Sequence, residues 1–238
     1  GFRGGAWVST FQSGSALPPL KSRFLNGPQG GAYDAAHESF LPKRPYNQPG
    51  YRSKLHKYFV TLHIMIREFH PISLRRRNSF GVDQQAARLV EFETPEDLRT
   101  FFAAGIPERW TVLAGGNNIL FTEDYNGVLL TPVARQIAVL GDDGSEVRVR
   151  VDAGVEWDDL VEWAVERGLW GIENLSLIPG KAGAAPVQNI GAYGCEAKDV
   201  IRRVEMFCVE TGALLTLDAA HCGFGYRESV FKHDLKGR

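Results

Sequence analysis

One segment of small and apolar residues, residues 172–194 with the sequence IENLSLIPGKAGAAPVQNIGAYG, constrains the fold more than any other part of the chain. Such a run cannot be an ordinary surface loop, because its many backbone amides and apolar side chains must be buried against something. The residues themselves leave two interpretations open. The segment either wraps a large, flat, partly polar ligand or crosses between two packed parts of the protein, where small residues admit neighbouring backbone.

The ligand interpretation gives the small and the polar residues of this segment separate tasks. The side-chain amides of Gln188 and Asn189 can form hydrogen bonds with the edge of a heterocycle. Small residues allow a phosphate or a planar ring to approach the backbone closely. The small residues that we assign to this task are Gly180, Gly183, Ala184 and Ala185.

A second candidate loop follows a predicted strand at residues 111–114. Successive backbone N–H groups in a concave run suit a pyrophosphate, and glycines leave the approach open. An ordinary tight turn explains the same residues, and the loop taken alone favours that structural interpretation. Its spacing matches neither the P-loop nor the Rossmann pattern. The residues of this loop are Gly115, Gly116, Asn117, Asn118, Ile119 and Leu120.

A third motif, Phe224-Gly225-Tyr226-Arg227-Glu228-Ser229, places an arginine between an aromatic residue and an acid. The planar donor fork of Arg227 suits a substrate carboxylate. The alternative is a surface ion pair with Glu228 or Asp234, which the spacing alone favours. The histidines form no HExxH or similar ligand pattern, so we predict no catalytic metal.

The N-terminal residues 1–64 differ in kind from the rest. They hold eight Lys or Arg and two Asp or Glu, a net charge of +6, whereas the whole chain has a net charge of -1. Gly, Pro and Ser interrupt every periodic pattern, so we expect little fixed structure and interpret residues 1–64 as an extension preceding a start at Met65. A basic nucleic-acid-binding arm is the alternative, but its basic residues are scattered rather than clustered. We therefore expect no nucleic-acid partner.

Cysteine usage and hydropathy bear on location. Cys195, Cys208 and Cys222 are odd in number and too widely spaced for a Cys-x-x-Cys motif, which indicates a reduced, cytoplasmic protein. No stretch approaches the roughly 20 apolar residues that span a bilayer, so we expect no membrane partner. The oligomeric state is left open.

Local signals predict strands and helices without a steady βαβ rhythm, which indicates an α+β fold. Thr94-Pro95-Glu96-Asp97 supplies an N-cap, a proline at the first helical position and two acids in the first turn. A second amphipathic helix is predicted at residues 156–167. Predicted strands and hairpins lie at residues 111–114, 128–131, 137–151 and 203–217.

Taken together and in order, AGGNNIL, ENLSLIPGKAGAAPVQNIGAYG and FGYRESVFKH resemble the UDP-N-acetylenolpyruvoylglucosamine reductase family, also called UDP-N-acetylmuramate dehydrogenase. The resemblance runs from about Asn78 to the end of the chain. It implies the FAD-binding fold of the vanillyl-alcohol oxidase and p-cresol methylhydroxylase group, with α+β subdomains at residues 65–135 and 136–238. FAD would be bound between them without a covalent link.

The resemblance also implies roles for individual residues. The loop from Gly115 to Leu120 would cradle the pyrophosphate, and Arg227 would be the catalytic arginine, with Tyr226 beside it at the substrate. Ser229 would have a structural role. The flavin would be wrapped by Pro179, Gly180, Gly183, Ala184, Ala185, Gln188, Asn189, Gly191, Ala192 and Gly194.

The implied reaction has two halves: NADPH reduces FAD, and hydride then passes to the enolpyruvyl group of a nucleotide-sugar substrate, in peptidoglycan synthesis. The family's proton-donating Ser and its catalytic Glu belong to a C-terminal substrate domain, and neither is assigned in this sequence. A fragment of a reductase is therefore our first expectation, and a flavin-binding module without catalysis is the second. The apolar strand that should follow FKHDLKGR is also not found, so we expect an unpaired strand edge in one sheet.

Overall fold

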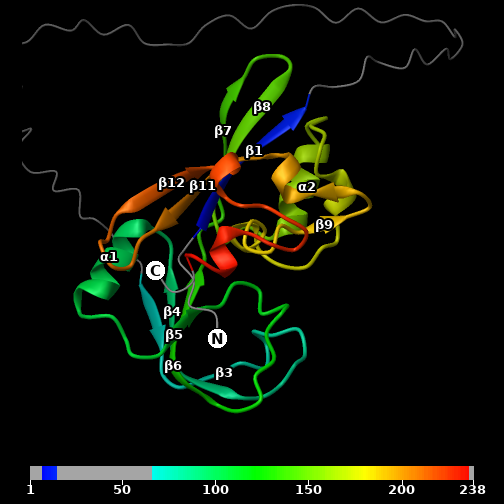
Figure 1. Ribbon diagram of the computed structural model, residues 1–238. Helices are drawn as coiled ribbons and strands as arrows, with labels where there is room; N and C mark the ends of the chain where they lie inside the picture. Colours follow the sequence, from blue (N-terminus) through cyan, green and yellow to red (C-terminus); the bar gives the residue numbers. More distant parts are fainter. Residues whose placement is uncertain (1–6, 15–65, 236–238) are drawn as a thin grey trace, which may run out of the picture. The chain divides into compact units, whose positions relative to one another are not determined.

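The computed structural model describes residues 66–235 and the backbone of the strand at residues 7–14. Within these ranges the chain forms two larger β-sheets, one short hairpin and two α-helices (Figure 1). The boundary that we predict between residues 135 and 136 falls between the last strand of one sheet and the first long hairpin of the other. The α+β class is confirmed.

The first sheet has a parallel centre. Its strand order is β2-β4-β6-β5, with β3 also paired to β4, and β4, β6 and β5 run parallel to one another. The bounds are β2 Arg67–Phe69, β3 Ile72–Ser73, β4 Gln85–Phe92, β5 Trp110–Val112 and β6 Tyr125–Pro132.

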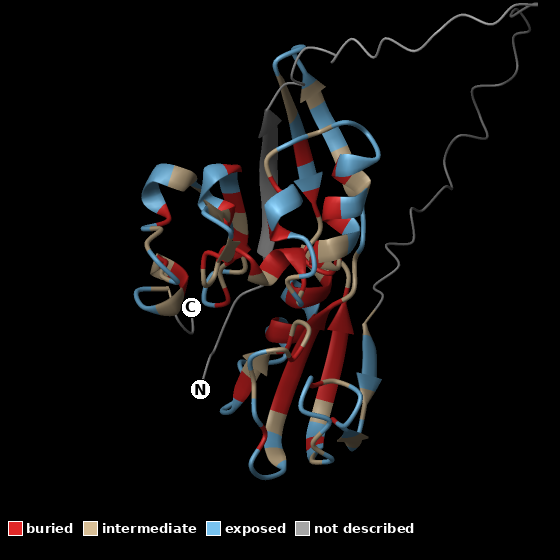
Figure 2. Cartoon of the chain, turned by 90° about the vertical axis from the view of Figure 1, so that its right-hand side faces the viewer, coloured by how far each residue is buried: buried red, intermediate tan, exposed pale blue. Residues whose placement is uncertain are grey.

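Both faces of this sheet are covered. Val90 and Leu130 belong to a core that includes the helix α1, Pro95–Ala103, whereas Leu89 and Leu129 belong to a core on the opposite face. Figure 2 shows buried residues running along these strands. Parallel strands that are buried on both faces read as continuous apolar runs, which explains the sequence VLLT in β6.

Helix α1 begins where the sequence predicts. The backbone N–H of Asp97 donates to the Thr94 hydroxyl at 3.2 Å, and the Thr94 N–H donates to the Asp97 carboxylate at 2.8 Å. This reciprocal pair is a capping box, and it satisfies donors that the first turn of a helix leaves open. The predicted helix start is confirmed.

We predict that Thr94→Ala lowers the free energy of unfolding by about 1 kcal/mol, because the N-cap acceptor is lost. Thr94→Ser keeps a hydroxyl at the same position and should stay close to the wild type. Denaturant unfolding of the three proteins measures the difference. Equal stability of the alanine and serine variants would show that the cap contributes nothing.

The second sheet is antiparallel throughout, with the strand order β12-β11-β1-β8-β7. Its hairpins β7-β8 and β11-β12 match the two hairpins predicted from alternation, which are thereby confirmed. The bounds are β1 Trp7–Gly14, β7 Ile137–Asp142, β8 Glu146–Val151, β11 Ile201–Phe207 and β12 Leu214–Asp218.

Helix α2, Trp157–Val165, supplies the core of this second half. Trp157 and Leu160 are each 1% exposed and belong to the same buried cluster as Val151 of β8 and Val204 of β11. The Trp157 indole N–H donates to the Leu175 carbonyl at 2.8 Å, which ties the helix to the start of the 172–194 segment. No helix in the part of the chain described is long and apolar enough to cross a membrane.

Strand β1 departs from the expectation of little fixed structure in residues 1–64. It pairs with β8 on one side and β11 on the other, and Figure 1 shows it in blue beside β8. The facing edges of β8 and β11 are therefore paired, and among the described strands β12 and β7 form the outer edges of this sheet. The unpaired edge that we expected stays a prediction. Alternation was too weak to reveal the strand, because Ser, Thr, Gln and Gly interrupt its apolar residues. The other residues of 1–64 lie outside those described.

Candidate functional site

A pocket opens where five segments distant in sequence meet. They are the end of β5 with the loop after it, the end of β6, Ala153 just after β8, residues 179–188 of the glycine-rich segment, and the C-terminal pair Phe231-Lys232. Most of the lining residues are small or apolar, and a few are polar. They are Val112, Ala114, Gly115, Gly116, Asn117, Asn118, Ile119, Pro132, Ala153, Pro179, Gly180, Gly183, Ala184, Val187, Gln188, Phe231 and Lys232.

The loop from Gly115 to Leu120 presents a row of open donors. Among the described residues, none of its six backbone N–H groups donates a hydrogen bond to protein. Backbone amides that converge on a pocket without protein acceptors are suited to an anion. Residues 115–119 of the loop line the pocket, where such donors would suit a pyrophosphate.

The shape of this loop depends on its second glycine. Gly116 has a φ of +66°, and a Cβ at this position would lie 2.0 Å from the Arg77 carbonyl oxygen. The Ser79 N–H donates to the Gly116 carbonyl at 3.2 Å, and the Asn117 side-chain amide donates to the Ser79 hydroxyl at 2.8 Å. Ser79 thus holds the loop through two hydrogen bonds.

The opposite wall is fixed by backbone pairing to the residues after β8. The Trp157 N–H donates to the Gly180 carbonyl and the Ala182 N–H to the Val155 carbonyl, each at 2.8 Å. Gly183 lies so close to Ala153 that a Cβ on the glycine would be 2.6 Å from the alanine Cβ. Packing therefore explains Gly183, although the residue also lines the pocket.

Gly180 has a different explanation. Its φ is +132°, and a Cβ built there would meet no protein atom closer than the Asn117 side-chain oxygen at 3.7 Å. The space in front of Gly180 is the pocket itself. The sequence left ligand approach and tight packing as alternatives for this segment. The structure supports ligand approach at Gly180 and tight packing at Gly183.

Lys181 is a buried cation behind this wall. The residue is 8% exposed, and its Nζ donates to the Pro132 carbonyl at 2.9 Å, which ties the segment to the end of β6. Desolvation is the main reason that its pKa lies below the usual 10.5, while the nearby Glu156 carboxylate acts in the opposite direction. Pro132 and Gly180 both line the pocket, so this bond helps to set the spacing of its walls.

Two further lining residues come from the C-terminal motif and were missed by sequence reasoning. Phe231 is buried, and Lys232 donates to the Arg227 carbonyl at 2.5 Å and to the Glu228 carboxylate at 3.1 Å. Both belong to the quoted motif FGYRESVFKH, but only Tyr226 and Arg227 were assigned ligand contacts. The positive charge of Lys232, in the same motif as Arg227, was the sequence signal that could have indicated an anion contact.

Ten of the predicted cofactor residues line the pocket, and six do not. Asn189 is fully buried, and its side chain donates to the Gly225 carbonyl at 2.9 Å and accepts from the Lys198 N–H at 3.0 Å. It therefore connects the glycine-rich segment to the arginine motif. The other five are placed as follows: Leu120 is exposed beyond the loop, Ala185 is buried beneath the pocket, Gly191 and Ala192 form β9, and Gly194 lies in the turn before β10, Cys195–Glu196.

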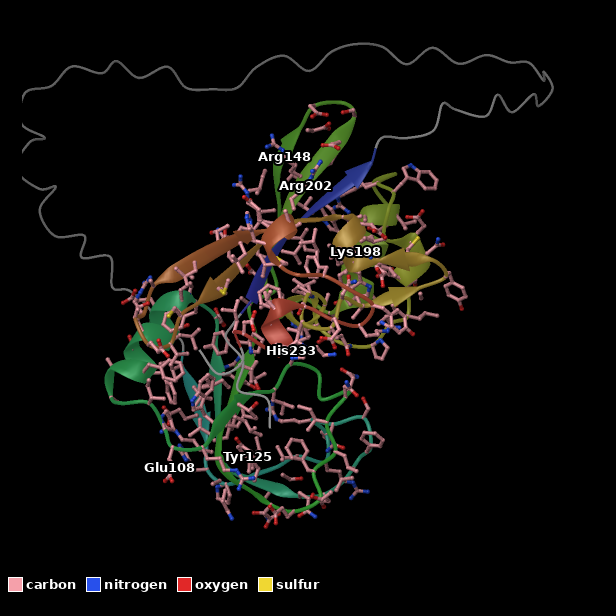
Figure 3. All side chains as sticks on the ribbon, in the orientation of Figure 1. Glu108, Tyr125, Arg148, Lys198, Arg202 and His233 are labelled. Atoms are coloured by element: carbon pink, nitrogen blue, oxygen red, sulfur yellow. The ribbon has the colours of Figure 1, made fainter. Side chains whose placement is uncertain are left out.

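Arg227 lies beside this hairpin rather than in the pocket lining. Its φ is +56°, and its guanidinium donates to the Gly191 carbonyl at 2.7 Å. Glu228 pairs with Lys232 and contacts the His233 ring, and among the described residues no ion pair joins Arg227 to Glu228 or Asp234, the alternative that the spacing favoured. Figure 3 shows His233 next to the C-terminal turn that carries Lys232.

Tyr226 and Ser229 have opposite environments. Tyr226 is 84% exposed, and the Arg227 guanidinium lies 6.0 Å from its ring centroid. Ser229 is buried and donates to the Val187 carbonyl at 2.5 Å. Its hydroxyl is thus used to anchor the motif against the glycine-rich segment.

The pocket fits a flavin dinucleotide in its chemistry. Open backbone donors and the Lys232 ammonium suit a pyrophosphate, and the small apolar wall from Pro179 to Val187 suits a planar ring. Gln188 adds a side-chain amide at the edge of this wall, 3.5 Å from that of Asn118. The fold and the site define a flavin-binding protein.

Comparison with known proteins agrees with this class. The pattern of the FAD binding domain family matches residues 86–218, more than half of the chain, and the chain therefore belongs to that family. The resemblance to UDP-N-acetylenolpyruvoylglucosamine reductases is also confirmed. A reductase of that name from Bacteroides fragilis strain YCH46 is 44% identical over 161 residues, which are 67% of this chain and 48% of the relative.

Other relatives carry the same name. One from Vibrio cholerae serotype O1 is 44% identical over 167 residues, covering 68% of this chain and 47% of the relative. The crystal structure of UDP-N-acetylenolpyruvylglucosamine reductase from Thermus caldophilus matches with a TM-score of 0.58 and 28% identity, over 69% of this chain and 57% of that chain. The chain thus spans about half the length of the curated relatives that it matches.

We predict that Gly116→Ala weakens FAD binding and lowers the melting temperature far more than Gly81→Ala. Both glycines have nearly the same φ, +66° and +64°, but a Cβ at Gly81 meets nothing within 4 Å. Gly81→Ala is the control, and it should lower the free energy of unfolding by only the strain of a positive φ, about 1 kcal/mol. Thermal unfolding and flavin titration of both variants make the comparison. Equal effects would show that the close approach to Arg77 is unimportant.

Lys181 predicts a pH dependence of stability. Because its pKa is lower in the folded state, the unfolded state binds more protons between that value and 10.5, and stability should rise with pH in this window. Lys181→Met should lack this rise. Denaturant unfolding at several pH values up to 10.5 measures it.

Lys198→Met is the matched control for this experiment. Lys198, labelled in Figure 3, pairs with Glu196, and this hydrogen bond raises the lysine pKa above its usual value. Lys198 therefore stabilises the folded state below pH 10.5, and this stabilisation is lost as the pH rises above 10.5, opposite to the effect of Lys181. An unchanged rise in Lys181→Met would mean that another group causes it.

Proposed function

We propose that this chain is the flavin-binding part of a reductase that uses NADPH to convert UDP-N-acetylglucosamine enolpyruvate to UDP-N-acetylmuramate in peptidoglycan synthesis. The observation that carries the proposal is the loop from Gly115 to Ile119, whose backbone N–H groups donate to no acceptor among the described residues and which lines the same pocket as Gly180. When bound, FAD would supply the redox chemistry of hydride transfer. The relatives' names supply the substrate.

The protein's own residues would bind and orient the cofactor. The loop amides would hold the pyrophosphate, and the ammonium of Lys232 would offset its negative charge. Pro179, Gly180 and Ala184 would form an apolar platform that excludes water from one side of the flavin ring.

Arg227 and Tyr226 would face the substrate instead. The bond from Arg227 to the Gly191 carbonyl fixes the guanidinium at the edge of the hairpin that follows the flavin segment. A cation at this place can stabilise the negative charge that develops on an enolpyruvyl carboxylate as hydride arrives. The exposed ring of Tyr226 would provide a contact surface for the nucleotide sugar.

A flavin-binding module without catalysis is the second candidate. It is favoured by the coverage, because the matched region is about half of each curated relative. The family's proton donors are not assigned within residues 66–235. Flavin reduction by NADPH separates the two candidates. Both require FAD binding, but only the reductase requires that NADPH reduce the bound flavin. The cytoplasmic location and the non-covalent attachment of FAD stay predictions.

The decisive experiment is an absorption spectrum of the full chain after mixing with FAD and desalting, followed by NADPH addition without oxygen. We expect a retained yellow flavin with a 1:1 stoichiometry, released on denaturation. Bleaching by NADPH would support the reductase, and retention without bleaching would support the module. A folded protein that loses all flavin would refute both.

A charge variant tests the assigned anion site. Lys232→Met should weaken FAD binding about tenfold, equivalent to about 1.4 kcal/mol, because a charge-assisted contact to the pyrophosphate is lost. Lys232→Arg keeps the charge and should bind more tightly than the methionine variant. Lys198→Met removes a paired lysine outside the pocket lining and serves as the matched control. Unchanged affinity in Lys232→Met would exclude this lysine from the site.

A further inference from the structure

The gap between β8 and β11 has the width of one strand. Both strands pair antiparallel with β1, so they run parallel to each other and share no ladder. Adjacent strands lie about 4.8 Å apart, which places β8 and β11 roughly 10 Å from each other. The facing edges of these two strands hold N–H and C=O groups that need a partner in the middle of a sheet.

The core on one face holds the two strands at this separation. Val149 and Val151 of β8 belong to the same buried cluster as Ile201 and Val204 of β11. The helix α2 packs in that cluster as well, through Trp157 among others. The spacing of the gap is thus anchored by side chains outside β1.

Ion pairs connect the same two strands on the other face. Arg150 of β8 lies 3.1 Å from Glu205 of β11, and Arg202 of β11 lies 3.3 Å from Glu146 of β8. Each pair reaches across the position of β1, from one neighbour to the other. Arg148 and Arg202, labelled in Figure 3, mark the two strands on this face. Exposed pairs add little stability, but they fit a gap of this width and register.

The strand that fills the gap comes from outside the region shared with the FAD binding domain family. The family pattern matches residues 86–218, whereas β1 consists of residues 7–14. Its register is continuous over six positions with β8, from Ser9 opposite Val151 to Gly14 opposite Glu146. With β11 it pairs at five positions, with one irregularity between Thr10 and Phe11.

The inserted strand also lies beside a turn that lines the pocket. β1 contacts η3, the 3-10 turn Ala182–Ala184, and this turn contributes Gly183 and Ala184 to the pocket lining. Ala153, which follows the paired end of β8, lies against Gly183 and lines the pocket too. Loss of the strand would remove support from both sides of the Gly183–Ala153 contact.

We propose that the facing edges of β8 and β11 form a strand-acceptor site, that residues 7–14 of the same chain are its occupant, and that occupancy is coupled to flavin binding. The coupling rests on the proposed flavin site, whereas the acceptor site does not. If two events stabilise the same pocket wall, each raises the affinity of the other by the same factor. The N-terminal segment would thus be a working part of the domain.

The first test compares Thr10→Pro with Thr10→Val in the full chain. Thr10 lies opposite Arg150 and Arg203, and proline there removes an N–H and strains the central strand. Valine keeps the N–H and a branched side chain. Hydrogen exchange should show faster amide exchange across residues 146–151 and 201–207 in the proline variant only. Unchanged protection of both strands in Thr10→Pro would overturn the acceptor site.

FAD titration of the same proteins tests the coupling. We expect Thr10→Pro to bind FAD at least tenfold more weakly than Thr10→Val, and saturating FAD to slow amide exchange in β8 and β11 of the wild type. Equal affinities, with protection lost in the proline variant, would overturn the coupling and leave the acceptor site standing. Failure of the wild type to bind FAD would count against the proposed function, while the exchange result would still decide the acceptor site.

A second experiment avoids any folding defect of the proline variant. A specific protease site is introduced between residues 15 and 65 of the full chain, and the cleaved protein is passed over a sizing column. The N-terminal fragment should co-elute with the remainder and be displaced by excess peptide of residues 5–16. Separation without loss of protection in β8 and β11 would overturn the proposal. An uncleaved wild type that elutes as a dimer would instead identify a second copy as the strand donor and overturn the assignment to the same chain.

Discussion

The pocket depends on the contact between Gly183 and Ala153, where two backbones approach so closely that no side chain larger than hydrogen fits on the glycine. The Ala182 and Gly183 N–H groups donate to the carbonyls of Val155 and Ala153, at 2.8 and 3.2 Å. These bonds fasten an otherwise irregular segment to the residues that follow β8. An apolar segment with many amides can be buried only if those amides are paired, which this arrangement achieves on one side while the other side faces the pocket.

The pocket lining has a polar part and an apolar part. The loop amides and Lys232, which also pairs with Glu228, provide donors in one part, whereas the wall from Pro179 to Val187 carries no charge except the buried Lys181 behind it. A ligand with one anionic part and one planar apolar part matches this division. Arg227 is tied to the Gly191 carbonyl outside the pocket lining. The pocket wall and the Arg227 contact thus lie on different parts of one continuous segment.

The second sheet shows that the family region and the folded unit are not identical. The FAD binding domain pattern includes β8, β11 and their hairpins, but the central strand comes from residues 7–14. A sheet can accept a strand from any part of the chain that offers an extended backbone, because the ladder bonds are made by main-chain groups. Specificity for the strand then depends on register and on the space that the flanking side chains leave.

The sequence by itself determined the elements that depend on neighbours along the chain. The capping box predicts the start of α1, alternation predicts both hairpins, and the order of three motifs identifies the flavin-binding class. Tertiary structure decided which motif residues reach the pocket. The Asn189 side chain forms hydrogen bonds with the backbones of Gly225 and Lys198 and does not line the pocket. Phe231 and Lys232 of the arginine motif do line it. Tertiary structure also decided the place of β1, because strand pairing depends on which edges are open, and that is settled only when distant segments meet.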